Sequence, residues 1–536
     1  MSNENIKNFV LFDNPLSQYP YQTNNNLIEK ISLSPKEKEI FSILKKILEK
    51  NNLNDTIFRV AGGWVRDKLL NRENIDIDIA INNKKGYEIA KLINDELYPK
   101  KNKIGLIQQN SQKGKHLETA TIKINGIWLD FVNLRCDDEN KIGNPIQDAK
   151  LRDITINSLF YNLNEEKIED FTNFGINDLK NGIIRTSTDS NKTFHDDPLR
   201  ILRVLRFATK FQFKIDDEIC ENVLNDKNFY KEQFLNVISI ERIEKEIKLI
   251  LQLSNPQSAI YALFKFDLLD SILKIKNYNE SDMIKNIKND IIFSVNLILI
   301  GNFIAKKFDF FYENNKEIFN DKNYRFNFFL FLLTIPYRNY LVKFAKEKEL
   351  ISVNKLIVKE SFKMTNEELK ENSIMNSNLD NLINLINNNN YKRLEIAQII
   401  RQIHTNNISK EFIAGISFEY IKKIYENENN KIIYEINENI LNEIIIKYKN
   451  FYNFIKNENL LHIDDLKPLF DGNEIIKILN IKPGKIIGIL IESLINIQIE
   501  DPKISKESAI DFLTKKRNQL KHLESENNQK SHKKKQ

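Results

Sequence analysis

Hydrophobic and polar positions follow two different periods in the two parts of the chain. Pro35–Lys50, which comes directly after Ser34, has apolar residues at helical spacing and proline in its first turn, and so predicts a helix. From about Thr56 to Leu163 the pattern changes to short runs of β-forming residues separated by turn residues. Beyond Pro198 almost all apolar residues recur with helical spacing. The pattern therefore predicts an α+β protein, with a mixed α/β head of roughly 170 residues followed by an all-helical remainder.

Four runs in the head have the length and composition of strands. We expect these strands at Ile57–Ala61, Ile75–Ile81, Ala120–Ile124 and Ile127–Leu134. Asn125-Gly126, between the last two runs, favours a tight hairpin turn. The segment before about Asn26 is polar and rich in asparagine, so we expect it to be poorly ordered.

The second of these strands carries the most informative chemistry. Strand alternation would place Ile75, Ile77, Ile79 and Ile81 on one face, and Asp76 and Asp78 together on the other. Two carboxylates about 7 Å apart along a strand can share divalent cations. Gly62-Gly63 lies between a predicted strand and a predicted helix, where backbone N–H groups can approach a phosphate. A phosphate cradle facing paired carboxylates is the arrangement that two-metal nucleotidyl transfer requires.

Two further clusters have both a structural and a functional interpretation. Arg152-Asp153 taken alone reads as a surface ion pair of little energetic value. Asp197 precedes Pro198 and suits a helix N-cap. Arginines at every third position of the following helix, Arg200, Arg203 and Arg206, form a stripe along one side. A guanidinium and a carboxylate on one helix could also read nucleobase edges, and the stripe alone does not decide between these interpretations.

Composition excludes several classes of protein. The chain has 536 residues and a net charge of +6. The last 22 residues, 515–536, carry eight Lys/Arg and two Asp/Glu, so the charge of the body is balanced and does not itself indicate nucleic-acid binding. Two cysteines exclude a disulfide framework and a four-cysteine zinc site. The longest apolar stretches are interrupted or too short for a bilayer. We expect an intracellular protein without a membrane span, in the cytoplasm, with the nucleus and mitochondrion as alternatives.

With these motifs in view, the chain resembles the class II tRNA nucleotidyltransferases, the CCA-adding enzymes, and specifically their eukaryotic type. The motifs that carry the resemblance are Ala61–Asp67, Ile75–Ile79, His116–Ile122, Trp128–Arg135, Arg152–Asn157, Asp178–Thr186, Asp197–Phe207, Ile240–Ile243, Asp471–Gly472 and Lys482–Gly488. The likeness is dense from about Thr56 to Leu251 and returns from Asp471 to Ala509, whereas the Asn-rich middle matches only in helical character.

The resemblance implies a DNA-polymerase-β-like catalytic head followed by an all-α neck, body and tail. On that basis the expected boundaries are a poorly ordered segment 1–33, a head 34–170, a neck 171–270, a body 271–460, a tail domain 461–514 and a basic disordered tail 515–536.

The resemblance also implies roles for individual residues. Asp76 and Asp78 would bind two Mg²⁺ ions and be catalytic, with Asp130 as the best candidate for a third carboxylate and Glu118 as another. The residues implied to contact the nucleotide are Gly62, Gly63 and Arg66 at the triphosphate, Arg152 and Asp153 at the ribose 2′-hydroxyl, Asp197 and Arg200 at the base edge, and Arg203 nearby. CTP and ATP are the implied substrates.

Three departures from the family pattern stand in the sequence. Leu151 replaces the first arginine of the ribose motif, and Asp196 stands where the base-reading motif often has Glu. The identity of the third carboxylate is open. The polar segment Gln108–Glu118 occupies the place of the loop that the family uses in switching from CTP to ATP.

The function implied is template-independent CTP(ATP):tRNA nucleotidyl transfer that adds or repairs the 3′-terminal CCA and releases pyrophosphate. The helical remainder would hold the tRNA acceptor stem and elbow, and neither a membrane nor an obligate protein partner is expected. Alternatives are a CC-adding or A-adding relative, a poly(A) polymerase, or a catalytically inactive RNA-binding protein. Metal-dependent hydrolysis at His195-Asp196 would rest on one dipeptide without further ligands.

Overall fold

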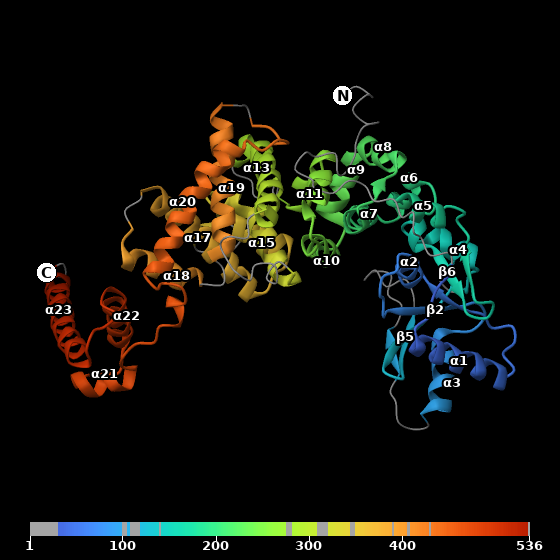
Figure 1. The fold of residues 1–536 in the computed structure, drawn as a ribbon, viewed down its shortest axis with the longest axis horizontal. Helices are drawn as coiled ribbons and strands as arrows, with labels where there is room; N and C mark the ends of the chain where they lie inside the picture. The colour runs from blue at the N-terminus through green and yellow to red at the C-terminus, as the bar shows by residue number, and fades with distance from the viewer. Residues whose placement is uncertain are drawn as a thin grey trace.

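The structure, a computed structural model, describes most of the chain. The described residues are 30–98, 104–107, 118–138, 141–274, 281–307, 320–343, 349–388, 391–404, 408–427 and 430–533. A mixed α/β head lies at one end and the last helices lie at the other, and both ends reach toward the same side of an open arch (Figure 1). Most of the predicted loop Gln108–Glu118 falls outside the described residues.

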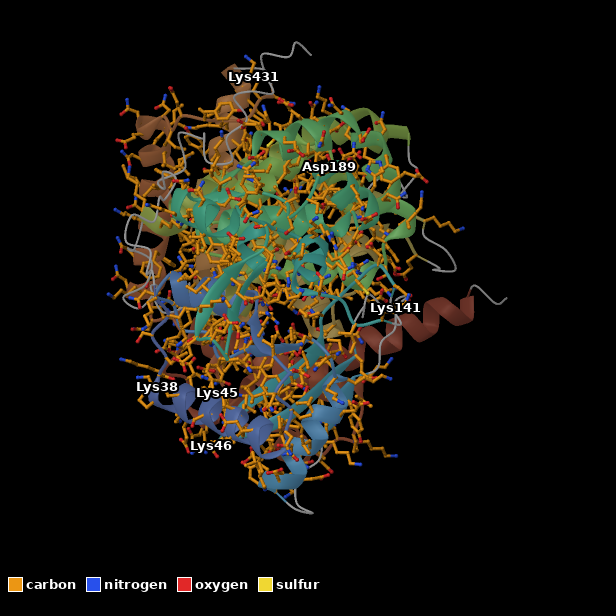
Figure 2. The ribbon with its side chains drawn as sticks, turned by 90° about the vertical axis from the view of Figure 1, so that its right-hand side faces the viewer. Lys38, Lys45, Lys46, Lys141, Asp189 and Lys431 are labelled. Carbon is orange, nitrogen blue, oxygen red and sulfur yellow. The ribbon has the colours of Figure 1, made fainter. Side chains whose placement is uncertain are left out.

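The first helix, α1, spans Pro35–Lys50, as its spacing predicted. Its start is fixed by a reciprocal capping box, in which the Glu37 N–H donates to Ser34 Oγ (3.3 Å) and the Ser34 N–H donates to the Glu37 carboxylate (2.7 Å). Lys38, Lys45 and Lys46 project from the outer surface of this helix (Figure 2). The opposite side of α1 packs on the head sheet, so the helix covers one face of the sheet.

The head is built on a seven-stranded sheet in the order β3-β4-β5-β2-β1-β6-β7. The strands are β1 Phe58–Ala61, β2 Ile77–Ile81, β3 Gly105–Ile107, β4 Thr119–Ile124, β5 Ile127–Asn133, β6 Leu159–Asn162 and β7 Lys167–Asp170. Only β2 and β5 pair in parallel, and they lie in the middle of the sheet. Four of these strands match the prediction, whereas β3, β6 and β7 were not predicted.

The second strand begins later than predicted. β2 starts at Ile77, and Ile75 is 79% exposed rather than sharing a face with the buried Ile77, Ile79 and Ile81. The physical reason is local: the Asn74 side-chain oxygen accepts a hydrogen bond from the Asp76 N–H (2.9 Å), which turns the chain just before the strand. The prediction for Ile75 was therefore wrong, and Asp76 lies immediately before the strand.

Helices cover the two faces of the sheet unequally. On one face, α1 and α3 lie beside the sheet (Figure 1). Their apolar side chains share one core with those of β2, β4 and β5. On the other face, Ala80 and Val132 pack with Ala149 of α4 in a small separate cluster. The remainder of that second face carries polar side chains at the end of the sheet where β2 begins. That region is where the predicted site residues lie.

The helices of the head and neck follow in chain order. They are α2 Gly63–Leu69, α3 Gly86–Leu97, α4 Pro145–Leu151, α5 Gly175–Asn181, α6 Ser190–Asp196, α7 Leu199–Phe211, α8 Asp217–Asn225, α9 Lys227–Glu232 and α10 Ile240–Leu251. The short strands β8 Ile183–Ile184 and β9 Lys214–Ile215 pair in parallel among them. The helix α7 begins one residue later than predicted, but the Asp197 carboxylate accepts a hydrogen bond from the Leu199 N–H (3.3 Å), so Asp197 still caps this turn.

The rest of the described chain is almost entirely helical, as predicted. It contains α11 Pro256–Lys265, α12 Leu269–Ile272, α13 Ser281–Lys307, α15 Lys322–Thr334, α16 Val353–Leu356, α17 Asn366–Asn388, α18 Arg393–Ile403, α19 Ile408–Asn427, α20 Glu438–Asn457, α21 Gly472–Leu479, α22 Lys485–Glu500 and α23 Lys506–Lys533. One antiparallel pair, β10 Leu341–Val342 with β11 Ile351–Ser352, is the exception. Among the described residues, Lys288–Lys307 is long and apolar enough to cross a membrane, but 67% of its apolar window is buried inside the protein, as in a core helix.

The C-terminal helices have their own apolar core. Phe470, Ile475, Leu490 and Leu494 cluster with residues of α23, apart from the continuous core of the preceding domains. Two hydrogen bonds from α18 to α22 join this unit to the body: Arg393 donates to the Ile499 backbone oxygen (2.6 Å) and Gln398 donates to the Asn496 side-chain oxygen (3.2 Å). We predicted a disordered segment from residue 515, but the structure continues α23 as a helix to Lys533. Its early residues Ala509 and Leu513 are anchored in the core, which explains how the helix is held at its start.

Candidate active site

Two carboxylates from different strands face each other on the polar part of the sheet. Asp78 of β2 and Asp130 of β5 are direct partners in the parallel register. The Thr121 hydroxyl of β4 donates to Asp130 Oδ1 (2.5 Å) and fixes that carboxylate. The pKa of Asp78 is raised from its ordinary value because the surrounding protein desolvates the carboxylate and because the Asp130 charge lies close to it. Asp130, the candidate third carboxylate, is therefore placed with Asp78 by the structure.

Asp76 lies at the same end of the sheet and adds to the negative charge around Asp78. Carboxylate oxygens of this kind are the hard ligands that Mg²⁺ prefers, and their mutual repulsion is relieved by a cation. Within the described part of the chain, no three acidic, His or Cys side chains already converge as a complete metal site.

Gly62 makes the sharp turn between β1 and α2 beside these carboxylates. Its φ is +68°, in the region that favours glycine, and its N–H donates to the Leu159 backbone oxygen (2.9 Å). A Cβ at this position would lie 2.7 Å from Arg152 Nη1 and 3.1 Å from the Asn157 backbone oxygen. A Cβ at Gly63, in contrast, would make only ordinary contacts. The two predicted glycines are thus brought to the carboxylates, and Gly62 is the one that the backbone requires.

Arg66 lies on α2 but points into the protein. Its Nε donates to Asp67 Oδ1 (2.8 Å), and its Nη1 donates to the Asn157 side-chain oxygen. The guanidinium lies over the rings of Phe211 and Phe207, at 4.8 and 5.3 Å from their centroids. Arg66 is therefore buried, and its guanidinium already has hydrogen-bond and aromatic partners. Through these contacts it joins α2 to the neck helix α7.

Arg152 and Asp153 do not pair with each other. Arg152 donates from Nη2 to Asp148 (3.2 Å) and from Nη1 to the Asn157 backbone oxygen (3.2 Å), which holds its guanidinium against Gly62. Asp153 is buried and pairs with Arg203 (Nη2 to Oδ2, 2.8 Å), while its other oxygen accepts from the Asn157 side chain (3.0 Å). Burial alone would raise the pKa of Asp153, but Arg203 and these hydrogen bonds hold it well below its ordinary value. The Asp153 carboxylate is therefore ionised and holds the Arg203 guanidinium and the Asn157 side chain in place.

All three arginines of the α7 stripe have partners in the structure. Arg200 donates to the Leu151 backbone oxygen (2.9 Å), Arg203 pairs with Asp153, and Arg206 donates to Glu246 of α10 (2.7 Å). The stripe thus joins α7 to the 151–153 segment on one side and to α10 on the other. Arg206 thus binds a residue of the neck, whereas Arg200 and Arg203 bind residues of the head.

Asp197 has a second partner besides the helix end that it caps. Its Oδ2 accepts from Arg242 Nη2 of α10 at 2.8 Å, while its Oδ1 accepts from the Leu199 N–H. Sequence analysis assigned no role to Arg242 beyond its place in the Ile240–Ile243 motif, because the contact joins residues far apart in the chain. Asn157 was likewise missed, although it binds Arg66, Arg152 and Asp153 at once.

His195, the basis of the hydrolysis alternative, has a structural environment. Its ring stacks on Phe229 at a centroid distance of 4.4 Å and an interplanar angle of 13°. Its Nδ1 lies 2.9 Å from the Asn191 backbone oxygen within α6. Packing therefore accounts for this histidine.

Known proteins resemble the chain in sequence and in fold. Residues 58–185 match the poly A polymerase head domain family. The mitochondrial CCA tRNA nucleotidyltransferase of Candida glabrata is 31% identical over 91% of this chain and 96% of its own length. That of Saccharomyces cerevisiae is 31% identical over 92% and 95%, respectively. Solved structures of a CCA-adding enzyme with CTP and with ATP have TM-scores of 0.58 and 0.55, at 20% and 21% identity, and each pairing covers 89% of this chain and 95% of the solved one. With its sheet, paired carboxylates and glycine turn, the chain belongs to the CCA tRNA nucleotidyltransferase family.

Proposed function

We propose that this chain adds or repairs the 3′-terminal CCA of tRNA, using CTP and ATP without a nucleic-acid template and releasing pyrophosphate. The observation that carries the proposal is the register pairing of Asp78 with Asp130 beside the Gly62 turn. Nothing about RNA binding alone favours carboxylates clustered where phosphates must lie, because phosphates are bound by positive groups. Catalysis of phosphoryl chemistry explains the cluster.

The nucleotide is placed by the β1–α2 turn and the groups around it. The first turn of α2, with Gly62 and Gly63 at its start, presents backbone N–H groups that suit the triphosphate. Arg152, held against Gly62, supplies positive charge and contacts the ribose end of the nucleotide. Asp153 acts as a positioning residue, because its carboxylate is already bound by Arg203 and Asn157.

Asp197 and Arg200 at the start of α7 read the base edge. Cytosine and adenine both present an amino donor beside a ring-nitrogen acceptor, which one carboxylate and one guanidinium satisfy together. Guanine and uracil present the reverse pattern. Because Asp197 is held by Arg242 and by the helix end, the base must compete for this carboxylate with partners already in place. Arg66 and Arg203 support the site from its buried side.

Asp76, Asp78 and Asp130 are the residues that would hold the two Mg²⁺ ions. Bound Mg²⁺ would make the RNA 3′-hydroxyl easier to deprotonate and offset charge on the nucleotide phosphates. The protein contributes the position of the ligands: the sheet register fixes Asp78 against Asp130, and Thr121 fixes the Asp130 carboxylate. The partly desolvated surroundings that raise the pKa of Asp78 also strengthen its attraction for a cation.

The helical remainder holds tRNA through phosphate contacts at the acceptor stem and elbow, so affinity should fall steeply as salt increases. We keep the boundaries 34–170, 171–270, 271–460 and 461–514 for head, neck, body and tail. The head boundary coincides with the end of β7 at Asp170. Two yeast relatives are named as mitochondrial enzymes, and we include the mitochondrion among the intracellular sites of action.

The test is the sequence added to tRNA that ends at its discriminator base. We expect two C residues with CTP alone, CCA with CTP and ATP together, and no addition with ATP alone. Addition of A alone, arrest after CC with both nucleotides present, or unlimited A-tailing would replace the proposal by an A-adding, CC-adding or poly(A)-polymerase activity, respectively. An Asp78→Ala sample prepared in parallel excludes a contaminating enzyme.

A further inference from the structure

The chain has two tryptophans with opposite environments. Trp64 is 1% exposed and lies in the head core, whereas Trp128 on β5 is 56% exposed. Trp128 lies opposite Lys123 of the neighbouring strand β4, and the Lys123 ammonium is 5.3 Å from the centroid of the indole ring. Single exposed apolar side chains are common, so exposure alone assigns no role. What distinguishes Trp128 is its position on the sheet near the carboxylates.

Trp128 shares a sheet face with the carboxylates. It precedes Asp130 by two residues on β5, which places both side chains on one face, about 7 Å apart along the strand. Leu129 pairs with Ile77, so Trp128 comes level with Asp76, the residue before Ile77. Lys123 likewise precedes the turn on the same face as Thr121, which binds Asp130. The aromatic–cationic pair therefore continues the acidic site toward the end of the hairpin.

The order of strands separates the two sides of the site. Gly62, Arg152 and the start of α7 lie on the β1 side of β2, and these are the groups proposed to hold the nucleotide. Trp128 and Lys123 lie on the other side, on β5 and β4. The reaction joins two substrates at the carboxylates between them. If the nucleotide enters from the β1 side, the RNA end must approach over β5 and β4.

We propose that Trp128, with Lys123, is a stacking platform for the unpaired 3′ end of the RNA acceptor. This proposal rests on the proposed function, because it names the second substrate of the same site. The indole stacks on the terminal base, and the Lys123 ammonium attracts an adjacent phosphate. Stacking suits this task because every base has a flat face, so the platform accepts different terminal bases.

The platform is held in place by the hairpin that carries it. The turn residue Asn125 donates from Nδ2 to Glu39 Oε1 of α1 (2.8 Å), which ties the hairpin end to the helix on the opposite face. Lys123 and Trp128 are the cross-strand pair next to the last pair before this turn. A base stacked on Trp128 would therefore meet a surface that is already positioned beside Asp76 and Asp130.

The kinetic test compares Trp128→Ala and Trp128→Phe with a matched control, Phe174→Ala. Phe174 is 51% exposed and has the Arg185 guanidinium 5.3 Å from its ring, but it lies at the start of α5 rather than on the carboxylate face. We expect Trp128→Ala to raise the KM for tRNA ending at the discriminator base about tenfold, as loss of one stacked base predicts. The KM for CTP should stay within about twofold, Trp128→Phe should recover most of the loss, and Phe174→Ala should match the wild type.

An unchanged KM for tRNA in an active Trp128→Ala variant would overturn the platform. A rise confined to the KM for CTP would also overturn it, because the ring would then serve the incoming nucleotide. An inactive wild-type chain would overturn the proposed function instead, so the two failures are distinguishable.

Tryptophan fluorescence gives a second measurement, which uses the wild-type chain and so does not require a substituted variant to fold. In the wild type, tRNA binding without Mg²⁺ should quench Trp128 emission and protect it from acrylamide, whereas CTP alone should do neither. Emission of Trp128→Phe comes from the buried Trp64 and should not respond to tRNA. Wild-type emission that is insensitive to bound tRNA would overturn the proposal even if Trp128→Ala failed to fold.

Discussion

Asp78 and Asp130 lie directly opposite each other on the parallel strands β2 and β5. Each carboxylate is supplied by a different strand, and the hydrogen bonds of the sheet set their separation. The Asp130 charge contributes to raising the pKa of Asp78, and Thr121 fixes Asp130 by a hydrogen bond. A site assembled in this way depends on the register of the sheet more than on any loop, so substitutions that keep the register should act on chemistry without unfolding the head.

The Gly62 turn should not tolerate a side chain. Gly62→Ala places a Cβ 2.7 Å from Arg152 Nη1 in a backbone conformation that L residues rarely adopt, so we expect a loss of about 2 kcal/mol in unfolding free energy and of most activity. Gly126→Ala is the matched control: its φ is also positive (+88°), but no atom lies within 4 Å of the added Cβ. Denaturant melts of both variants measure the difference, and equal losses would contradict the close contact with Arg152.

The Asp153–Arg203 pair, in which the carboxylate is buried and the guanidinium is 35% exposed, should contribute more than a fully exposed pair. Asp153→Ala leaves Arg203 without its nearest carboxylate, and because Arg203 is partly exposed and keeps Glu246 nearby, we expect a loss of about 2 kcal/mol in unfolding free energy. Glu241→Ala removes the exposed partner of Lys363 and should change the unfolding free energy much less. Because the folded-state pKa of Asp153 is depressed, its contribution is present above the unfolded-state pKa and is lost as pH falls below it. Melting temperatures at pH 7 and at about pH 2.5, below the unfolded-state pKa of an aspartate, measure both effects.

Glu411 of α19 should make the body less stable at alkaline pH. This carboxyl is fully buried, neither of its oxygens has a hydrogen-bond partner in the described part of the structure, and burial raises its pKa well above the ordinary value. An acid whose folded-state pKa is raised binds its proton more tightly when folded, so stability falls as pH rises above the unfolded-state pKa, by up to about 1.4 kcal/mol per pH unit. Glu411→Gln should melt higher than the wild type at pH 8, with a smaller difference at pH 5. A constant difference across this range would contradict the burial of an ionisable carboxyl.

Arg200 and Arg206 lie on the same helix stripe, but replacing each by alanine should change a different property of the protein. Arg200 reaches the head at Leu151, so Arg200→Ala should weaken the preference for CTP and ATP over GTP and UTP beyond a simple loss of rate. Arg206 is bound to Glu246 within the neck, so Arg206→Ala should lower the melting temperature and leave the nucleotide preference unchanged. Relative kcat/KM values for the four nucleotides measure this. Preserved selectivity in Arg200→Ala would exclude a base-reading role.

Local signals made part of the fold predictable from sequence. The capping box of Ser34 with Glu37 and the spacing of apolar residues set α1, and alternation set which side of β2 carries Asp78. Alternation failed at Ile75 because an asparagine side chain, Asn74, turns the backbone one step before the strand. The short strands β6 and β7 are held by pairing with β1 and with each other, and their sequences carry little signal of their own.

The sequence was enough to predict most residues of the candidate site, but not which of them contact one another. The glycines and aspartates stand in short motifs, and the sheet brings them together as the motifs indicated. Which arginine pairs with which acid was not predictable, because Asp153 with Arg203 and Asp197 with Arg242 join distant segments. Asn157 contacts its near neighbours Arg152 and Asp153 and also the distant Arg66, and only the structure shows that one residue joins all three.

The most direct test of the central claim is single-turnover addition of C to tRNA by Asp78→Asn, measured with the affinity for the same tRNA. Asparagine keeps the size of the side chain and removes its charge, so the head should fold and tRNA affinity should stay within about twofold of the wild type. Because we propose that the paired carboxylates are the metal ligands, we predict that the rate of transfer falls by a factor on the order of 1,000 or more. Transfer at a rate near that of the wild type, in a variant free of wild-type protein, would contradict the assignment of this site.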